Sequence, residues 1–153
     1  MSLKLIAQIL VVSSLTFSSV TQASNDPLVG KWKTIDDRTG YSLSDVVIQK
    51  NKTGSYSATI VEIRAAPGAV MQTACVKCNG EHKNKPLVGF TPLYNLKNSA
   101  NSSSEFINGK YVDPRTGNEY QSKAHLSNNG KHLIIRNTTP GATTGRNLTW
   151  VKY

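Results

Sequence analysis

Short runs of alternating hydrophobic and polar residues dominate the chain after residue 23. Residues 29–35 alternate in this way, and residues 41–48 and 56–63 follow at short intervals. A period of two is the pattern of β-strands with one buried face. Further runs lie at residues 87–96, 106–107, 111–112, 119–126, 132–136 and 147–153. Because no window after residue 23 carries a helical stripe, we predict an all-β chain of about eight short strands.

Turn signals separate these runs. Segments 36–40 and 51–54 both end in Gly after Asp or Asn, which supplies the positive φ that hairpin turns require. Asn108-Gly109 and residues 113–117 and 128–130 give similar signals. Turns this short join neighbouring antiparallel strands, so we predict a single antiparallel meander that forms a sandwich or a barrel.

Two segments interrupt the meander. Residues 65–85 contain both cysteines, and a loop of this length in a compact domain is usually functional or tied down. Residues 98–104 are polar and of low complexity, which predicts a mobile surface loop. Neither half of the chain supplies a complete core alone, so we predict one domain.

The N-terminus has the pattern of a secretory signal peptide. Lys4 supplies a positive start, residues 5–12 are an apolar run, and Ala23 closes a site that signal peptidase reads. We therefore predict a signal peptide at residues 1–23 and a mature domain at residues 24–153. Polar residues interrupt the apolar run and no later segment is apolar enough to cross a bilayer, so we predict export without a membrane span.

The chain is basic, with 18 Lys and Arg against 9 Asp and Glu and a formal net charge of +9. Such a surface favours anionic partners. The basic residues are scattered, without a block of roughly five or six like charges, which argues against a nucleic-acid-binding arm. We therefore expect a small lipophilic or anionic ligand, or contact with the surface of the cell envelope, and no nucleic acid as partner.

The only two cysteines form the motif Cys75-Val-Lys-Cys78, and His82 follows shortly after. In an oxidising compartment we predict a disulfide, which in so short a loop contributes only ~2 kcal/mol and holds the loop more than the fold. Two alternatives stay open. Cys75, Cys78 and His82 together offer a metal site for Zn²⁺ or Cu⁺, whereas the disulfide interpretation needs no cofactor. Neighbouring lysines would also stabilise a thiolate for redox chemistry.

No motif for catalysis is present. The chain lacks the serine-hydrolase elbow, the phosphate-binding loop, the dinucleotide fingerprint and the HExxH metalloprotease motif. Asp36, Asp37 and Asp113 fall in turns, where carboxylates cap backbone N–H groups. His125 and His132 flank a turn and are predicted to be exposed strand residues. We therefore expect no catalytic residues and favour a binding protein over an enzyme.

Gly30 and Trp32 on the first strand, together with Arg146 and Trp150 on the last, resemble the calycin pattern of lipocalins and avidins. In that pattern an early Gly-x-Trp packs against an Arg or an aromatic residue of the terminal strand, where the barrel closes. The resemblance implies that these four residues close a barrel. A Trp would plug one end of it, and a guanidinium can stack on the Trp face.

A closer resemblance covers nearly the whole mature chain. Five blocks occur in order: residues 30–40, 75–80, 83–89, 113–120 and 145–150. They look like those of an exported proteobacterial family, domain-of-unknown-function family 2147, which is thought to be lipocalin-like. The resemblance implies a lipocalin-like barrel and a periplasmic location, and it carries over no catalytic residue. After Arg136 the family usually shows Gly and an aromatic residue, whereas this chain continues with Asn137-Thr-Thr-Pro-Gly.

These observations lead to one main hypothesis. We expect a periplasmic lipocalin-like barrel that binds a small apolar or amphipathic ligand or a component of the cell envelope. An eight-stranded barrel of this kind can enclose one small ligand. Residues 65–85 would then cover the barrel mouth. A protein that handles metal or redox equivalents through the Cys75–Cys78 loop, and a non-catalytic envelope adaptor, are the alternatives.

Overall fold

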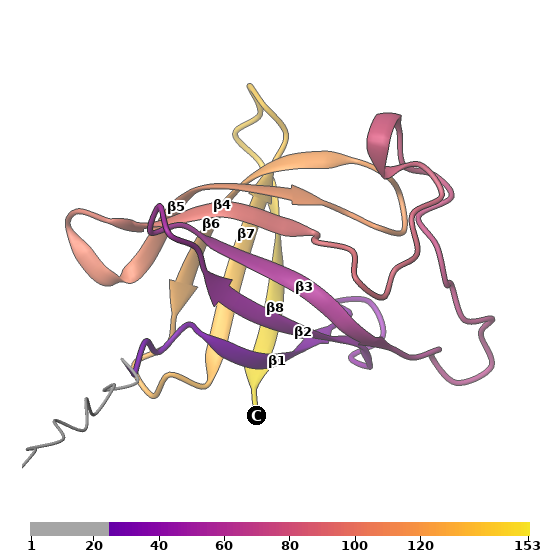
Figure 1. The fold of residues 1–153 in the computed structure, drawn as a ribbon, viewed down its shortest axis with the longest axis horizontal. Coiled ribbons are helices and arrows are strands. Elements are labelled where there is room, and N and C mark those ends of the chain that lie inside the picture. Colours follow the sequence, from indigo (N-terminus) through magenta and orange to yellow (C-terminus); the bar gives the residue numbers. More distant parts are fainter. Residues whose placement is uncertain (1–24) are drawn as a thin grey trace, which may run out of the picture.

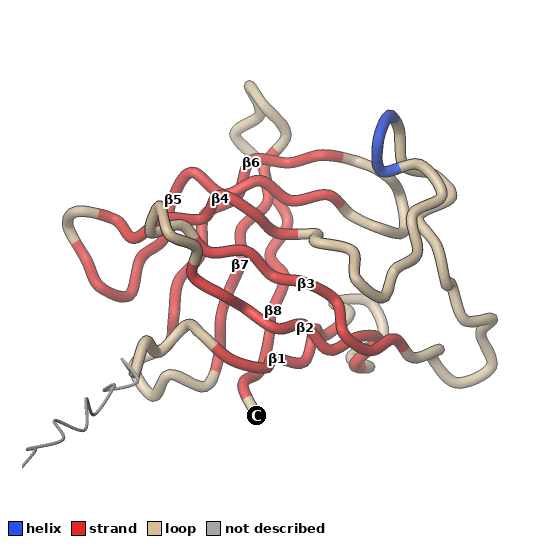
Figure 2. Tube along the Cα trace, in the orientation of Figure 1, coloured by secondary structure: helices blue, strands red, loops and turns tan. Residues whose placement is uncertain are grey.

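Eight antiparallel strands follow one another around a closed barrel (Figures 1 and 2). A computed structural model describes residues 25–153, so the predicted signal peptide lies outside the described residues. The strands are β1 (Gly30–Ile35), β2 (Ser42–Lys50), β3 (Tyr56–Ile63), β4 (Leu93–Ser99), β5 (Ser102–Val112), β6 (Glu119–Leu126), β7 (His132–Thr138) and β8 (Gly145–Lys152). A 3-10 turn, η1 (Gly80–His82), lies between β3 and β4.

The barrel closes where the first strand pairs with the last. β1 and β8 are antiparallel, with Trp32 opposite Lys152 and Thr34 opposite Trp150. Every other pairing joins sequence neighbours, which confirms the predicted meander. Closure leaves no open sheet edge for another strand to join. Within residues 25–153 the structure has no helix that is long and apolar enough to cross a bilayer.

Alternation along the strands fills the barrel interior with apolar side chains. On β7, Leu133 and Ile135 are buried while their neighbours are exposed, as a period of two requires. All eight strands contribute to a single hydrophobic core, including Trp32, Val46, Ile48, Ala58, Ile60, Leu93, Leu96, Phe106, Ala124, Leu133, Ile135, Leu148 and Trp150. The core therefore occupies much of the space that would hold a ligand in a wide, empty barrel.

Two sequence predictions around β5 were wrong. Asn108-Gly109 is a bulge inside one long strand rather than a turn, with Asn108 at φ 60° and a register shift between Phe106 and Gly109. A Cβ on Gly109 would lie 2.8 Å from Leu96 Cδ1, so the residue allows close strand approach. The predicted loop at residues 98–104 is mostly strand, because β4 and β5 extend to Ser99 and from Ser102.

The N-terminal segment packs across one end of the barrel. Trp32 donates its indole N–H to the Leu28 carbonyl at 2.9 Å, and Leu28 itself is buried. Beside it, the Tyr56 hydroxyl donates to Asp26 Oδ2 at 2.8 Å, and Lys50 Nζ lies 3.2 Å from the same oxygen. These contacts hold the N-terminal segment across the end at which the β2–β3, β4–β5 and β6–β7 turns lie, and an open depression of about 330 Å³ remains beside Asp26, Lys50 and Tyr56.

The opposite end carries the longer connections. The β1–β2 and β5–β6 turns lie there together with the whole segment 64–92, at the right of Figure 1. The longest connection between strands of the described chain therefore lies at this end of the barrel.

Candidate functional site

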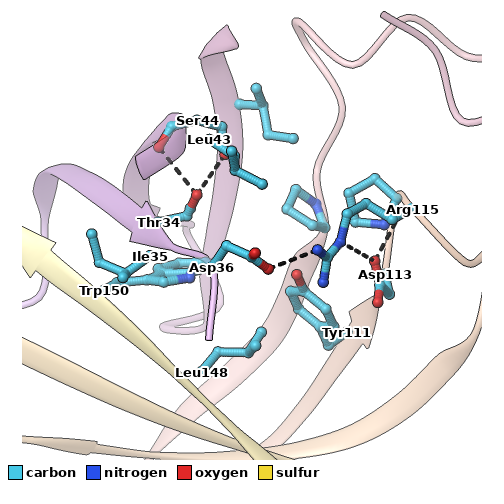
Figure 3. Close-up of a pocket in the computed structure, with 13 residues that line it drawn as sticks. Thr34, Ile35, Asp36, Leu43, Ser44, Tyr111, Asp113, Arg115, Leu148 and Trp150 are labelled. Carbon is cyan, nitrogen blue, oxygen red and sulfur yellow. Dashed lines mark hydrogen bonds and ion pairs between the residues drawn. The ribbon is translucent and has the colours of Figure 1, made fainter. Parts of the chain in front are cut away.

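A hollow of about 80 Å³ lies at this open end (Figure 3). Its apolar wall includes Ile60, Leu148 and Trp150, which belong to the core. Polar groups line the other side, contributed by the β1–β2 hairpin and the β5–β6 turn. They are Thr34, Asp36, Ser44, Tyr111, Asp113 and Arg115. The hollow thus joins the apolar core of the barrel to a polar rim.

A larger groove of about 220 Å³ adjoins the hollow beneath the segment 64–92. The two spaces share five lining residues, namely Leu43, Ser44, Ile60, Pro114 and Arg115. The groove is otherwise mostly apolar, with Ile63, Ala66 and Leu87 among its walls, and Arg64 lines it as well. The first part of segment 65–85, up to Gln72, therefore lines a groove beside the barrel mouth, and the predicted cover over the mouth stays a prediction.

The β5–β6 turn places Arg115 at the junction of these spaces. Asp113 Oδ1 accepts the Arg115 backbone N–H at 2.9 Å, which is the capping role predicted for that carboxylate. The guanidinium donates to Asp36 Oδ1 at 2.7 Å. Burial alone would raise the pKa of Asp36, but the hydrogen bond from Thr39 and the charge of Arg115 outweigh it and lower that pKa.

Arg146 on β8 completes a network of ion pairs at the rim. Its guanidinium makes a two-point contact with Asp37, with Nε to Oδ2 at 2.6 Å, and its Nη1 lies 3.8 Å from Asp113. The hydrogen bonds from Arg146 lower the pKa of Asp37, so this carboxylate stays ionised. The network ties β8 to the β1–β2 turn and the β5–β6 turn.

Tyr111 brings a neutral hydroxyl to the hollow. Figure 3 shows its ring below Arg115, with the hydroxyl directed toward that guanidinium. Burial raises the pKa of Tyr111, so the phenol stays protonated throughout the physiological range. Within residues 25–153 the structure gives its hydroxyl no hydrogen bond that meets ordinary geometry. The group is therefore available as a donor and an acceptor.

The cysteine motif holds the segment 64–92 against the β5–β6 turn. Cys75 and Cys78 form the predicted disulfide, and both are buried. A Cβ on Gly117 would overlap the Lys77 carbonyl oxygen, so the two turns are in direct backbone contact. Gln72 Nε2 adds a hydrogen bond to the Pro114 carbonyl at 2.6 Å. We call this set of contacts the disulfide clamp.

The fold and the rim geometry can be compared with known proteins. A family model described as "Uncharacterized protein conserved in bacteria (DUF2147)" matches residues 30–152. The chain belongs to this family. The solved structure of HP1028 from Helicobacter pylori, described as belonging to the lipocalin family, matches with a TM-score of 0.66. It shares 19% sequence identity, and the match covers 82% of each chain, which shows a lipocalin-like fold. Curated proteins give no match.

The residues predicted to close this DUF2147 barrel are all at or near the β1–β8 seam. Trp32 and Trp150 are buried in the core, and Gly30 begins β1 with φ +129°. Arg146 does not lie over Trp32. The cation over the Trp32 ring is Lys152 Nζ, 5.3 Å from the ring centroid, whereas Arg146 pairs with Asp37.

The three predicted metal ligands, Cys75, Cys78 and His82, do not form a metal site in the structure of this DUF2147 domain. A disulfide engages both sulfurs of Cys75 and Cys78, and the His82 ring packs against Phe90 with centroids 5.5 Å apart. Among residues 25–153 no three His, Cys, Asp or Glu residues come together as a metal-binding group. The metal hypothesis for Zn²⁺ or Cu⁺ therefore concerns only a reduced form of this loop.

Sequence reasoning missed Tyr111 and Arg115 as rim residues. Arg115 sat within the turn signal at residues 113–117, and its partner Asp36 is distant in sequence. A side chain that points from a turn into a barrel mouth leaves no periodic signal. Tyr111 could have been found as an inward position on β5, but the Asn108-Gly109 bulge shifts the alternation before it.

Proposed function

We propose that this DUF2147 protein binds a small apolar or amphipathic molecule at the open end of its barrel, in the periplasm. The observation that carries the proposal is the hollow of about 80 Å³ that joins a groove of about 220 Å³ beneath the segment 64–92. The lipocalin-like fold also favours ligand binding, since small-ligand sites commonly lie in the mouths of β-barrels.

The filled core sets the place and size of the ligand. Because inward side chains occupy the barrel, the ligand binds at the mouth rather than deep inside. An apolar cavity of roughly 150 Å³ accepts benzene, and typical sites for drug-sized ligands begin near 300 Å³. The groove lies between these sizes and suits a ligand with a short acyl or aromatic portion.

The lining sets the chemistry of the ligand. Ile60 and Leu87 offer apolar contact, which stabilises binding by roughly 25 cal/mol per Å² of apolar surface removed from water. Tyr111 offers a neutral hydroxyl at the rim, and the guanidinium groups of Arg64 and Arg115, which also pair with Asp45 and Asp36, flank the groove. This arrangement favours an apolar tail together with a polar or anionic head group.

A titration with octanoate, a short amphipathic anion, tests the site with a matched pair of variants. Ala66 lines the groove, so Ala66→Trp fills it, whereas Ala100 lies in the β4–β5 turn at the other end of the barrel. We expect Ala66→Trp to weaken octanoate binding at least tenfold, on the order of 1.4 kcal/mol, and Ala100→Trp to leave it unchanged. Equal affinity in both variants would refute the site.

The periplasmic location rests on the signal peptide pattern at residues 1–23. Mass spectrometry of the protein recovered from its own cells gives the N-terminus directly. A mature chain beginning at Ser24 in the periplasmic fraction supports the location. An intact Met1 start in the cytoplasmic fraction contradicts it and leaves the groove itself unaffected.

A further inference from the structure

Four large exposed apolar side chains belong to the segment 64–92 beside the barrel mouth. Val70 is 96% exposed, Val76 59% and Val88 54%, and Met71 is exposed as well. The other large exposed hydrophobic side chains of the described chain are Val29, Tyr41, Val61, Ile134 and Tyr153. Nearly half of the large exposed hydrophobic side chains of the described residues therefore lie on this one segment, and concentrated exposed apolar surface is typical of interaction sites.

Three lysines accompany these side chains. Lys77, Lys83 and Lys85 are exposed on the same segment, and no ion pair engages them within residues 25–153. The only acidic residue of residues 64–92 is Glu81. The segment therefore combines apolar side chains with an uncompensated positive charge.

The disulfide clamp keeps this segment in place. The Cys75–Cys78 bond, the backbone bridge between Ala74 and Pro86 and the contact with Gly117 fix the chain on both sides of the lysines. Val76 lies between the two buried cysteines and is directed outward by that turn. The segment that carries these apolar side chains lies at one end of the molecule (Figure 2), and its residues 74–86 are held in place by the disulfide clamp.

We propose that Val70, Met71, Val76 and Val88, with Lys77, Lys83 and Lys85, form a docking surface for an anionic phospholipid bilayer. A stable protein interface usually engages 20–30 residues on each side, roughly, whereas this surface offers a few apolar side chains and a cationic cluster. That combination matches a lipid surface, where apolar groups enter the headgroup region and each Lys adds about 1 kcal/mol on anionic lipid. Docking would hold the adjoining groove close to the membrane, and it does not depend on ligand binding.

Vesicle co-sedimentation of protein recovered after export tests the proposal. We expect binding to vesicles of equal parts phosphatidylcholine and phosphatidylglycerol, weak binding to phosphatidylcholine alone, and release as salt rises. We expect the double variant Lys77→Glu with Lys83→Glu to lower the partition coefficient onto the phosphatidylglycerol vesicles by about thirtyfold or more. Its control, Lys97→Glu with Lys123→Glu, makes the same charge change on β4 and β6 and stays within about twofold of wild type.

A second pair of variants tests the apolar contribution. Val76→Ser with Val88→Ser lowers partition roughly tenfold, whereas Ile134→Ser on β7 does not. Thermal unfolding of each variant confirms that the barrel is intact. The docking surface is refuted if phosphatidylglycerol does not increase the binding of wild-type protein to vesicles. It is also refuted if the control variants lose as much vesicle binding as the variants of the docking surface. Octanoate binding is measured on the same variants and should not change. A failure of membrane docking can then be distinguished from a failure of the proposed ligand site.

Discussion

At the scale of single residues, Asp45 is a buried carboxylate with three charged or hydrogen-bonding partners. It lies on the outer face of β2 but is fully buried beneath longer side chains. Lys31 Nζ lies 3.0 Å from Oδ2, Arg64 pairs with Oδ1, and the Tyr153 hydroxyl donates to Oδ2 at 2.6 Å. One carboxylate therefore connects β1, the start of segment 64–92 and the last residue of the chain.

Asp45→Asn removes the charge and keeps the shape of the side chain. We expect it to lower the free energy of unfolding by about 2 kcal/mol, since hydrogen bonds to buried charged groups contribute in that range. Glu62→Gln is the control, because Glu62 stands opposite Asp45 on β3 but is exposed. The control should change stability by less than about 0.5 kcal/mol in denaturant titration.

The loss of stability in Asp45→Asn should depend on pH. Burial alone would raise the pKa of Asp45, but the hydrogen bonds from Tyr153 and Lys31 and the charge of Arg64 outweigh it and lower that pKa. Its stabilisation is therefore complete above the ordinary value of 3.8 and is lost as the pH falls through the lowered pKa of the folded state. The difference between wild type and Asp45→Asn should shrink in acid. A difference that persists unchanged would contradict the assigned role.

At the scale of elements, the sequence predicted the strands well wherever a Gly-containing turn separated them. β3 and β6 have the predicted bounds, because the turns before them require positive φ at Gly54 and Gly117. The same signal misled at Asn108-Gly109. A positive φ also suits a bulge, and which of the two forms depends on partner strands that local sequence does not show.

The contact between the disulfide clamp and the β5–β6 turn gives a prediction of its own. Gly117 and Gly40 have nearly the same φ, +76° and +74°, but only Gly117 has backbone within reach of a Cβ. Gly40→Ala should cost about 1 kcal/mol of stability for the left-handed conformation alone. Gly117→Ala must also displace the Lys77 carbonyl, so we expect a cost at least about 2 kcal/mol larger.

Differential scanning calorimetry and limited proteolysis measure the effect of these two variants. Gly117→Ala should expose the segment 64–92 to protease, whereas Gly40→Ala should not. If Gly117→Ala and Gly40→Ala lose the same stability and leave the segment 64–92 equally resistant to protease, the disulfide clamp does not hold the segment.

At the scale of the whole molecule, the fold followed from the sequence more readily than the site did. The period of two and the spacing of turns indicate eight antiparallel strands, and the Gly30-Lys-Trp32 resemblance indicates that they close. The site depends on pairs such as Asp36 with Arg115, which are brought together only by closure of the barrel. Whether the barrel interior is filled depends on the inward side chains of all eight strands together, so it could not be predicted from any single strand.

The most direct test of the central claim is to locate the octanoate site by backbone amide chemical shifts. We predict saturable shifts at Ile60, Leu87 and Tyr111, around the hollow and the groove. The opposite end, near Asp26 and Tyr56, should stay unchanged although an open depression lies there too. Shifts that do not saturate, or that centre on this opposite end, would contradict a ligand site at the mouth of the barrel beside the segment 64–92.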